Sequence, residues 1–148
     1  MKQEHEPISG DEWLLRRVHR QYFRPGQFMV ISPNAFEPRV RGRAPDTDGI
    51  SLFRAACLSR PEEVLSPITP NKRKDYGVVR ISVRFIKSLG LNVVSRPVPD
   101  LPGHVVIPEL NAYDYAANKS RFTPIKMRLA EEASQRGNTL IWPEGVSP

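Results

Sequence analysis

Residue types that can catalyse reactions occur at four separated positions, Arg17, Ser51, His104 and Glu109. His104 opens the apolar run 105–107, and Glu109 follows five residues later. A histidine at the start of a strand can act as a general acid or base, with a carboxylate behind it. On an unbroken strand, however, residues five apart lie on opposite faces, and Pro108 interrupts this strand. His104 therefore has two interpretations, a catalytic base or a hydrogen-bonded structural residue.

An arginine on the first strand, a serine that opens a later strand and a downstream glutamate resemble the scheme of ADP-ribosyltransferase-type enzymes. The matching residues are Arg17, Ser51 and Glu109, three isolated positions without a contiguous motif. The resemblance implies that a nicotinamide dinucleotide would bind near Arg17. An alternative function is therefore a small enzyme that acts on RNA or on a nicotinamide dinucleotide, as a hydrolase or an ADP-ribosyltransferase-like toxin. In that enzyme His104 would be the acid–base residue and Arg17 would hold phosphate.

Positive charge is the strongest compositional signal. The 148 residues include 22 Lys and Arg against 16 Asp and Glu, which gives a formal net charge of +6. The planar guanidinium of arginine matches phosphate and carboxylate groups. The candidate anion-binding residues form three clusters: Arg16, Arg17, Arg20 and Arg24; Arg39, Arg41 and Arg43; and Lys72, Arg73 and Lys74.

Aromatic residues lie close to two of these clusters. Tyr22 and Phe23 lie within the first cluster, between Arg20 and Arg24, and Tyr76 lies close after the third. Arginines with aromatic stacking platforms are typical of proteins that bind single-stranded nucleic acid. No helix-turn-helix, zinc-finger or RNA-binding-sheet signature accompanies them. We therefore predict a non-enzymatic binding module whose Arg-rich loops engage an anionic partner, with RNA or DNA ahead of an acidic protein; the alternative is a solvated basic surface.

The sequence indicates neither a metal nor a cofactor. Three histidines and the single Cys57 lack the spacing of zinc ligands. The segment 46–49 resembles the middle of a calcium loop, but Ala44 and Ala55 stand where that motif needs acidic residues. No glycine-rich phosphate-binding motif or nucleophile elbow is present. We accordingly expect no metal site and no cofactor.

The apolar runs and the cysteine content predict a cytoplasmic protein that does not enter a membrane. The longest apolar runs are far shorter than the ~18 residues of a membrane span. The charged start of the chain does not match a signal peptide. One cysteine cannot form an internal disulfide, so the fold does not depend on an oxidising compartment.

Length and periodicity predict a flexible N-terminal tail at 1–10 and a single α+β domain at 11–148. We expect a mixed or antiparallel sheet of about five to six short strands, two to three helices and proline-rich loops. The expected strands are 13–18, 28–31, 51–58, 76–81, 92–95, 105–107 and 139–142. Helices are expected after three N-cap candidates, Ser59, Ser82 and Thr123. Pro61 and Pro124 fit the first turn of their helices, and Gly90 and Gly137 end the second and third.

Overall fold

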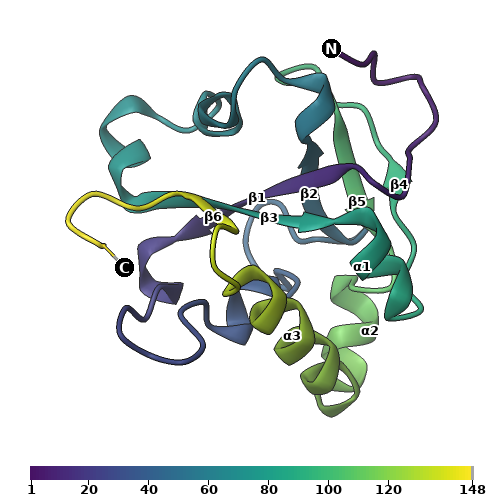
Figure 1. Cartoon of the computed structure of the whole chain (residues 1–148). Coiled ribbons are helices and arrows are strands. Elements are labelled where there is room, and N and C mark those ends of the chain that lie inside the picture. The colour runs from purple at the N-terminus through teal and green to yellow at the C-terminus, as the bar shows by residue number, and fades with distance from the viewer. Residues whose placement is uncertain (148) are drawn as a thin grey trace.

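The computed structural model describes residues 1–147, so Pro148, the last position of the expected domain, lies outside the described residues. The strands are β1 (Trp13–His19), β2 (Ile50–Arg54), β3 (Tyr76–Ser82), β4 (Val94–Ser95), β5 (His104–Ile107) and β6 (Thr139–Ile141). The α-helices are α1 (Val83–Ser88), α2 (Ala112–Ala117) and α3 (Lys119–Ala133). Short 3-10 helices occupy several of the connections (Figure 1).

The strands form one sheet in the order β4-β5-β2-β1-β3-β6, and every neighbouring pair is antiparallel. This arrangement confirms the expected single α+β domain with an antiparallel sheet. The long β1–β3 pairing runs from Trp13↔Ser82 to His19↔Tyr76. Within residues 1–147, none of the helices has the length and apolar content that crossing a bilayer requires.

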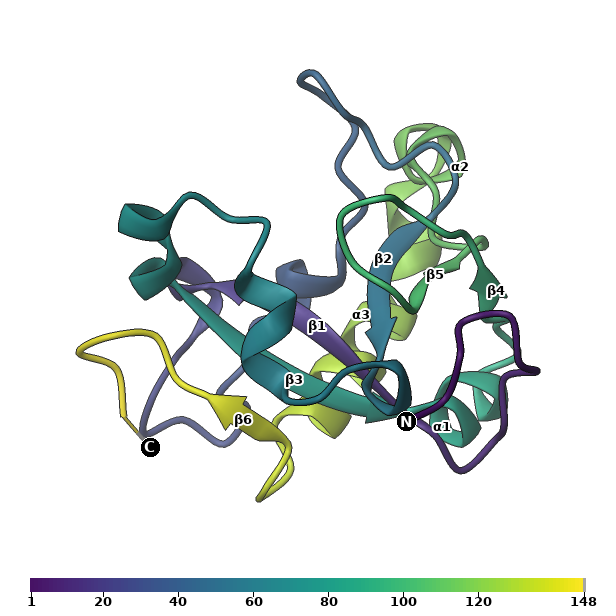
Figure 2. The same ribbon diagram turned by 90° about the horizontal axis from the view of Figure 1, so that it is seen from above.

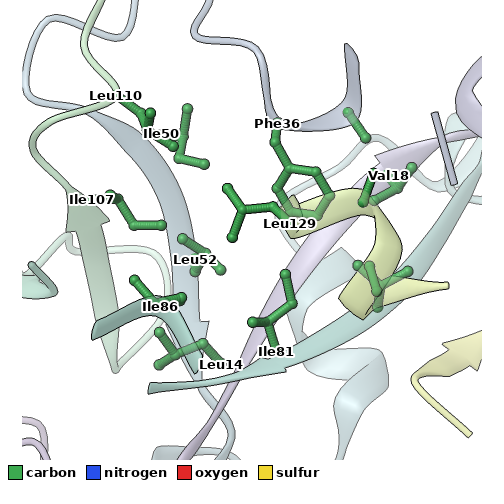
Figure 3. Packing of buried hydrophobic residues seen from close by; sticks show 14 of the residues in the cluster. Leu14, Val18, Phe36, Ile50, Leu52, Ile81, Ile86, Ile107, Leu110 and Leu129 are labelled. Atoms are coloured by element: carbon green, nitrogen blue, oxygen red, sulfur yellow. The ribbon is translucent and has the colours of Figure 1, made fainter. Parts of the chain in front are cut away.

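Two apolar clusters cover the two faces of the sheet. The three α-helices lie on one face, below the sheet in Figure 1. There, Leu129 of α3 and Phe36 pack against strand residues such as Ile81, and Figure 3 shows these side chains pointing toward one another. The smaller cluster includes Leu15 of β1 and Val64 of the 3-10 helix η4 (Pro61–Leu65) on the other face. Leu14 and Leu15, neighbours in β1, are thus buried on opposite faces of the sheet.

One expected strand is absent. The run 28–31 contributes only an isolated bridge between Ile31 and Phe23, and the 98% exposed Phe28 lies in the preceding turn. The prediction was wrong because a short apolar run does not by itself determine the type of element. Ile31 is fully buried, Met29 and Val30 pack against the core from its edge, and the chain then enters the 3-10 helix η2 (Pro33–Phe36), which Ser32 caps.

The helix predicted after Ser82 is confirmed, whereas the predicted caps at Thr123 and Ser59 are wrong. The Ser82 hydroxyl accepts a hydrogen bond from the Phe85 backbone N–H at 3.1 Å, and α1 follows as expected. Thr123, in contrast, is not a cap, because α3 already begins at Lys119 and carries Pro124 in its interior. The prediction of Ser59 as an N-cap was also wrong, since Arg60 precedes η4 without a capping side chain.

A buried ion pair holds the N-terminal segment against the sheet. Arg54 donates from Nε to Glu12 Oε1 at 2.8 Å and from Nη2 to Glu12 Oε2 at 2.9 Å. Its other bonds go to the backbone carbonyls of Glu4, Glu6 and Pro7. Arg54 thus makes five hydrogen bonds, as many as its guanidinium has N–H groups. The mobility of the expected tail at 1–10 stays a prediction, but the segment has specific contacts with the domain.

The Glu12 carboxylate should make the protein sensitive to acid. Burial opposes its ionisation, but hydrogen bonds from Arg54, the Ser9 backbone N–H and Lys2 outweigh burial and lower the pKa of Glu12 from 4.5 to about 2. A lowered folded-state pKa gives stability that is present above pH 4.5 and is lost as the pH falls toward 2. We expect a loss of about 3 kcal/mol over this range, measured by urea unfolding at each pH. A Glu12→Gln variant should lack this part of the pH dependence; an unchanged pH profile would contradict the assignment.

Candidate functional site

A cleft opens where β1 and β2 separate. The two strands pair only at Leu14↔Arg54 and Leu15↔Phe53. Beyond these positions β1 continues along β3, whereas the first half of β2 follows β5. Figure 2 shows the two strands diverging from this shared end. The cleft between them has a volume of about 690 Å³, within the range of about 300–1,000 Å³ found for ligand sites.

Arg16 spans the gap between the two strands. Its Nε donates to the Ala35 carbonyl at 2.8 Å, and its Nη1 donates to the Ser51 carbonyl of β2 at 2.7 Å. Burial lowers the pKa of Arg16 to about 10. The guanidinium therefore remains a cation near neutral pH, at a cost in solvation that its two carbonyl partners only partly offset.

Arg17 borders the same cleft from the other face of β1. Its guanidinium carbon lies 5.4 Å from the centre of the Phe53 ring, and Nη1 donates to the Val64 carbonyl at 3.3 Å. The Arg16 guanidinium lies instead over Phe36, in the larger apolar cluster. Burial also lowers the pKa of Arg17. The split in the sheet lets arginines from opposite faces reach one cleft.

Neither arginine is neutralised by a carboxylate. Within residues 1–147, no ion pair includes Arg16 or Arg17. Arg54 shows the contrasting arrangement, with Glu12 occupying two of its donors. Charges withdrawn from water are costly unless they are paired. Asp46 favours the charged form of Arg16 only from beyond ion-pair distance, so the cleft keeps an excess of positive charge that an anionic ligand would compensate.

The rim of the cleft adds further charges. Four arginines border it, Arg16, Arg17, Arg39 and Arg41, against the two carboxylates Glu37 and Asp46, an excess of two positive charges. Arg39 is exposed and pairs with the half-buried Asp46, with a separation of 3.8 Å between Nη2 and Oδ1. Such a pair is weak on the solvent side, so the Arg39 side chain can rearrange around a ligand, whereas the Arg39 backbone N–H holds Asp46 Oδ2 at 2.7 Å.

Two of the three expected stacking residues are at the cleft. Tyr22 and Tyr76 line it, and the Tyr76 ring meets the His19 ring edge-on at 5.2 Å between centroids. Phe23 is elsewhere, because it is buried in the core with its ring 5.5 Å from that of Trp142. Phe23 therefore offers no face on which a base could stack.

The remaining basic residues lie outside the cleft. Arg24 and Arg43 are exposed and do not border it. Arg20 forms an ion pair with Asp75 at 3.5 Å and donates to the Glu144 carbonyl. The cluster 72–74 lies exposed on the 3-10 helix η5 (Pro70–Asp75). Of the three basic clusters read from the sequence, the structure brings together parts of two.

Ser51 and His104 are hydrogen-bonded to each other. His104 Nε2 lies 2.9 Å from Ser51 Oγ, and His104 Nδ1 lies 2.6 Å from the Arg96 carbonyl oxygen. Because a carbonyl only accepts, Nδ1 carries the proton, and Nε2 of the neutral ring accepts from the serine hydroxyl. The imidazole also packs against Phe53, with 5.1 Å between ring centroids. A hydroxyl and an oriented base thus meet behind Ser51, which lines the cleft, whereas His104 does not border it.

Glu109 does not join this group. Its Oε1 accepts from the Asn92 backbone N–H at 2.8 Å, and its Oε2 accepts from Asn92 Nδ2 at 2.7 Å. Glu109 does not border the cleft either. The structure therefore places Arg17, Ser51 and His104 on one side of the sheet, whereas Glu109 fixes the loop before β4.

Of the two carboxylates that border the cleft, Glu37 also contacts two helices, and sequence analysis missed it. Its Oε1 accepts a hydrogen bond from the Tyr115 hydroxyl, and its Oε2 lies 3.9 Å from Lys126 Nζ. Burial and the contact with Glu37 raise the pKa of Tyr115 to about 12. No sequence signal marks this group, because Tyr115 and Lys126 come from two late helices that only the fold brings to Glu37.

Comparison of the chain with protein-family models, with curated proteins and with solved structures found no match. Across residues 1–147, His, Cys, Asp and Glu side chains form no group of three or more that could hold a metal ion. The charges, hydrogen bonds and shape of the cleft are therefore the observations that indicate its ligand.

Proposed function

We propose that the protein binds single-stranded nucleic acid, RNA or DNA, in the cleft between β1 and β2. The observation that carries this proposal is the pair Arg16 and Arg17, two partly buried cations without a carboxylate partner within residues 1–147. Phosphate groups would supply the missing negative charge, and guanidinium groups bind phosphate through charge-assisted hydrogen bonds.

The aromatic lining supports nucleic acid over an acidic protein. Tyr22 and Tyr76 border the same cleft as the arginines, and bases stack on aromatic side chains whatever their sequence. A carboxylate-rich peptide would use the arginines but not these rings. The cleft volume of about 690 Å³ fits part of a flexible strand, whereas a duplex would need a wider groove.

The proposal predicts salt-dependent binding of RNA. We would measure fluorescence anisotropy of a labelled, mixed-sequence single strand of about 12 nucleotides, in the range of known single-strand site sizes. If the four cleft arginines each contact one phosphate, the logarithm of the binding constant should fall with a slope of about −3 against the logarithm of salt concentration. Absence of binding at low salt would overturn the proposal and favour an acidic protein as partner.

Substitution of Arg17 by glutamine should weaken this binding by about 10-fold or more, because one charge-assisted hydrogen bond contributes about 1.5–3 kcal/mol. The salt slope should also become shallower by about 0.7. The control is Arg121→Gln, which removes the same charge from an exposed position on α3. Equal losses in both variants would show that binding depends on net charge and not on the cleft.

A further inference from the structure

We propose that Ser51 is a nucleophile activated by His104, and that it cleaves a phosphodiester bond of the strand in the cleft. This inference rests on the proposed function, because the bound nucleic acid is its substrate. It goes beyond binding, because it assigns a reaction to a serine that lines the cleft. The residues that carry it are Ser51, His104 and Arg17.

The hydrogen bonds give Ser51 and His104 the arrangement of a nucleophile and its base. The Ser51 hydroxyl donates to His104 Nε2 at 2.9 Å, within the reach that proton transfer needs. The Arg96 carbonyl accepts from Nδ1 at 2.6 Å and therefore fixes which ring nitrogen is free to take a proton. The Phe53 ring supports one side of the imidazole. The base is thus held by a third group, as activated nucleophiles require.

The strand pairing explains why these residues meet. β2 and β5 are antiparallel, with Phe53 opposite His104 and Ser51 opposite Val106. Ser51 and His104 are therefore diagonal neighbours on one face of the sheet, close enough for side chains to touch. Ser51 lies where β2 has already left β1, so this residue borders the cleft on the side away from β5.

Arg17 supplies positive charge on the same face. Its guanidinium lies over Phe53, the ring that also contacts His104. A guanidinium beside the reacting phosphate stabilises the charge that gathers on its oxygens during displacement. Arg16 holds the Ser51 carbonyl at 2.7 Å and so fixes the backbone that carries the nucleophile.

The reaction balances with water as the only co-reactant. Ser51 Oγ forms a bond to phosphorus while the bond from phosphorus to the leaving sugar oxygen breaks, and the serine proton passes through His104 Nε2 to that oxygen. Water then attacks phosphorus, the Oγ–P bond breaks, and a proton from the water returns to Ser51 through His104. The products are two strands, one ending in a hydroxyl and the other in a phosphate.

A fluorophosphonate tests the nucleophile without knowledge of the preferred sequence. Its phosphorus should form a bond to Ser51 Oγ with loss of fluoride, and peptide mass spectrometry should find the adduct on Ser51. Ser51→Ala should abolish the adduct, and His104→Gln should slow labelling by at least about 100-fold, the usual contribution of a general base. The control is Ser95→Ala, a half-buried serine on β4, and circular dichroism would show that each variant is folded.

Cleavage of an end-labelled RNA single strand tests the substrate. Wild-type protein should produce shorter fragments, and Ser51→Ala protein prepared in the same way should not. A wild-type protein that binds RNA but is neither labelled nor able to cleave overturns this inference and leaves the proposed function standing. Labelling of Ser51 without RNA binding overturns the nucleic-acid substrate and the proposed function together. Equal labelling of Ser51 and Ser95 overturns the role of His104.

Discussion

Replacing Glu12 with alanine should lower the free energy of unfolding by about 3–5 kcal/mol, the usual effect of removing one partner of a buried ion pair. Arg54 is 1% exposed, and Glu12 occupies two of its five hydrogen bonds. Without the carboxylate, the guanidinium stays buried with only backbone carbonyls as partners. Because domains of this size are stable by only about 5–15 kcal/mol, much of the total would be lost. Urea unfolding followed by circular dichroism at neutral pH would measure the change.

Glu62 provides the matched control for this experiment. It is an exposed glutamate at the start of η4, and Glu62→Ala should change the unfolding free energy by about 0.5 kcal/mol or less. The Glu12 variant should also loosen the segment 1–10, since the Glu12 carboxylate accepts hydrogen bonds from Lys2 Nζ and the Ser9 backbone N–H. Hydrogen exchange would detect that loosening. A Glu12 variant as stable as the Glu62 variant would mean that water replaces the carboxylate at Arg54.

Sequence patterns predicted the structure where the type and the ends of an element depend on residues close in the chain. The cap at Ser82, the helix after it and the strand at 76–81 all follow from neighbouring residues, and the structure confirms them. Pro124 shows the limit of that logic. Proline is favoured in a first helical turn, yet α3 starts five residues earlier. Packing of α3 residues such as Phe122 and Leu129 into the core outweighs the local preference.

The candidate site was predictable in residue type but not in arrangement. Arg16 and Arg17 are adjacent in the chain, so one strand was enough to suggest that both serve one site. Ser51 and His104 are far apart, and their contact depends on the register that places Phe53 opposite His104. Glu109 was considered with His104 because the two are close in the chain, and Glu37 was overlooked because its partners Tyr115 and Lys126 come from helices far along the chain.

No sequence pattern predicted the cleft, because the cleft forms where β1 and β2 stop pairing and separate. Both strands have the residue types of continuous strands, but they pair at only two positions. What directs β2 away from β1 is its pairing with β5 and the turn that precedes it. That turn lies at 47–48, and no sequence pattern indicates the close approach of Gly49 to β5. The geometry at Gly49 therefore connects the stability of the fold to the shape of the cleft.

Replacing Gly49 with alanine should destabilise the protein by about 3 kcal/mol or more, because two separate costs combine there. The backbone at Gly49 has a φ of +121°, which side-chain-bearing residues rarely adopt. An added Cβ would also lie 2.2 Å from the Ile107 carbonyl oxygen and 3.0 Å from Pro108 Cα. Both atoms belong to the backbone, so relief requires β2 and β5 to move apart. Urea unfolding would measure the loss.

The variant Gly42→Ala is the matched control, because it has the cost of the positive φ without the steric clash. Gly42 also has a positive φ, +92°, but no atom within 4 Å of the added Cβ, so we expect a loss of only about 1–2 kcal/mol. Moving β2 away from β5 would displace Ser51 and the carbonyl that Arg16 binds. Folded Gly49→Ala protein should therefore bind RNA more weakly than Gly42→Ala protein. Equal stability and equal RNA affinity of the two variants would mean that the contact with β5 does not hold β2 in place.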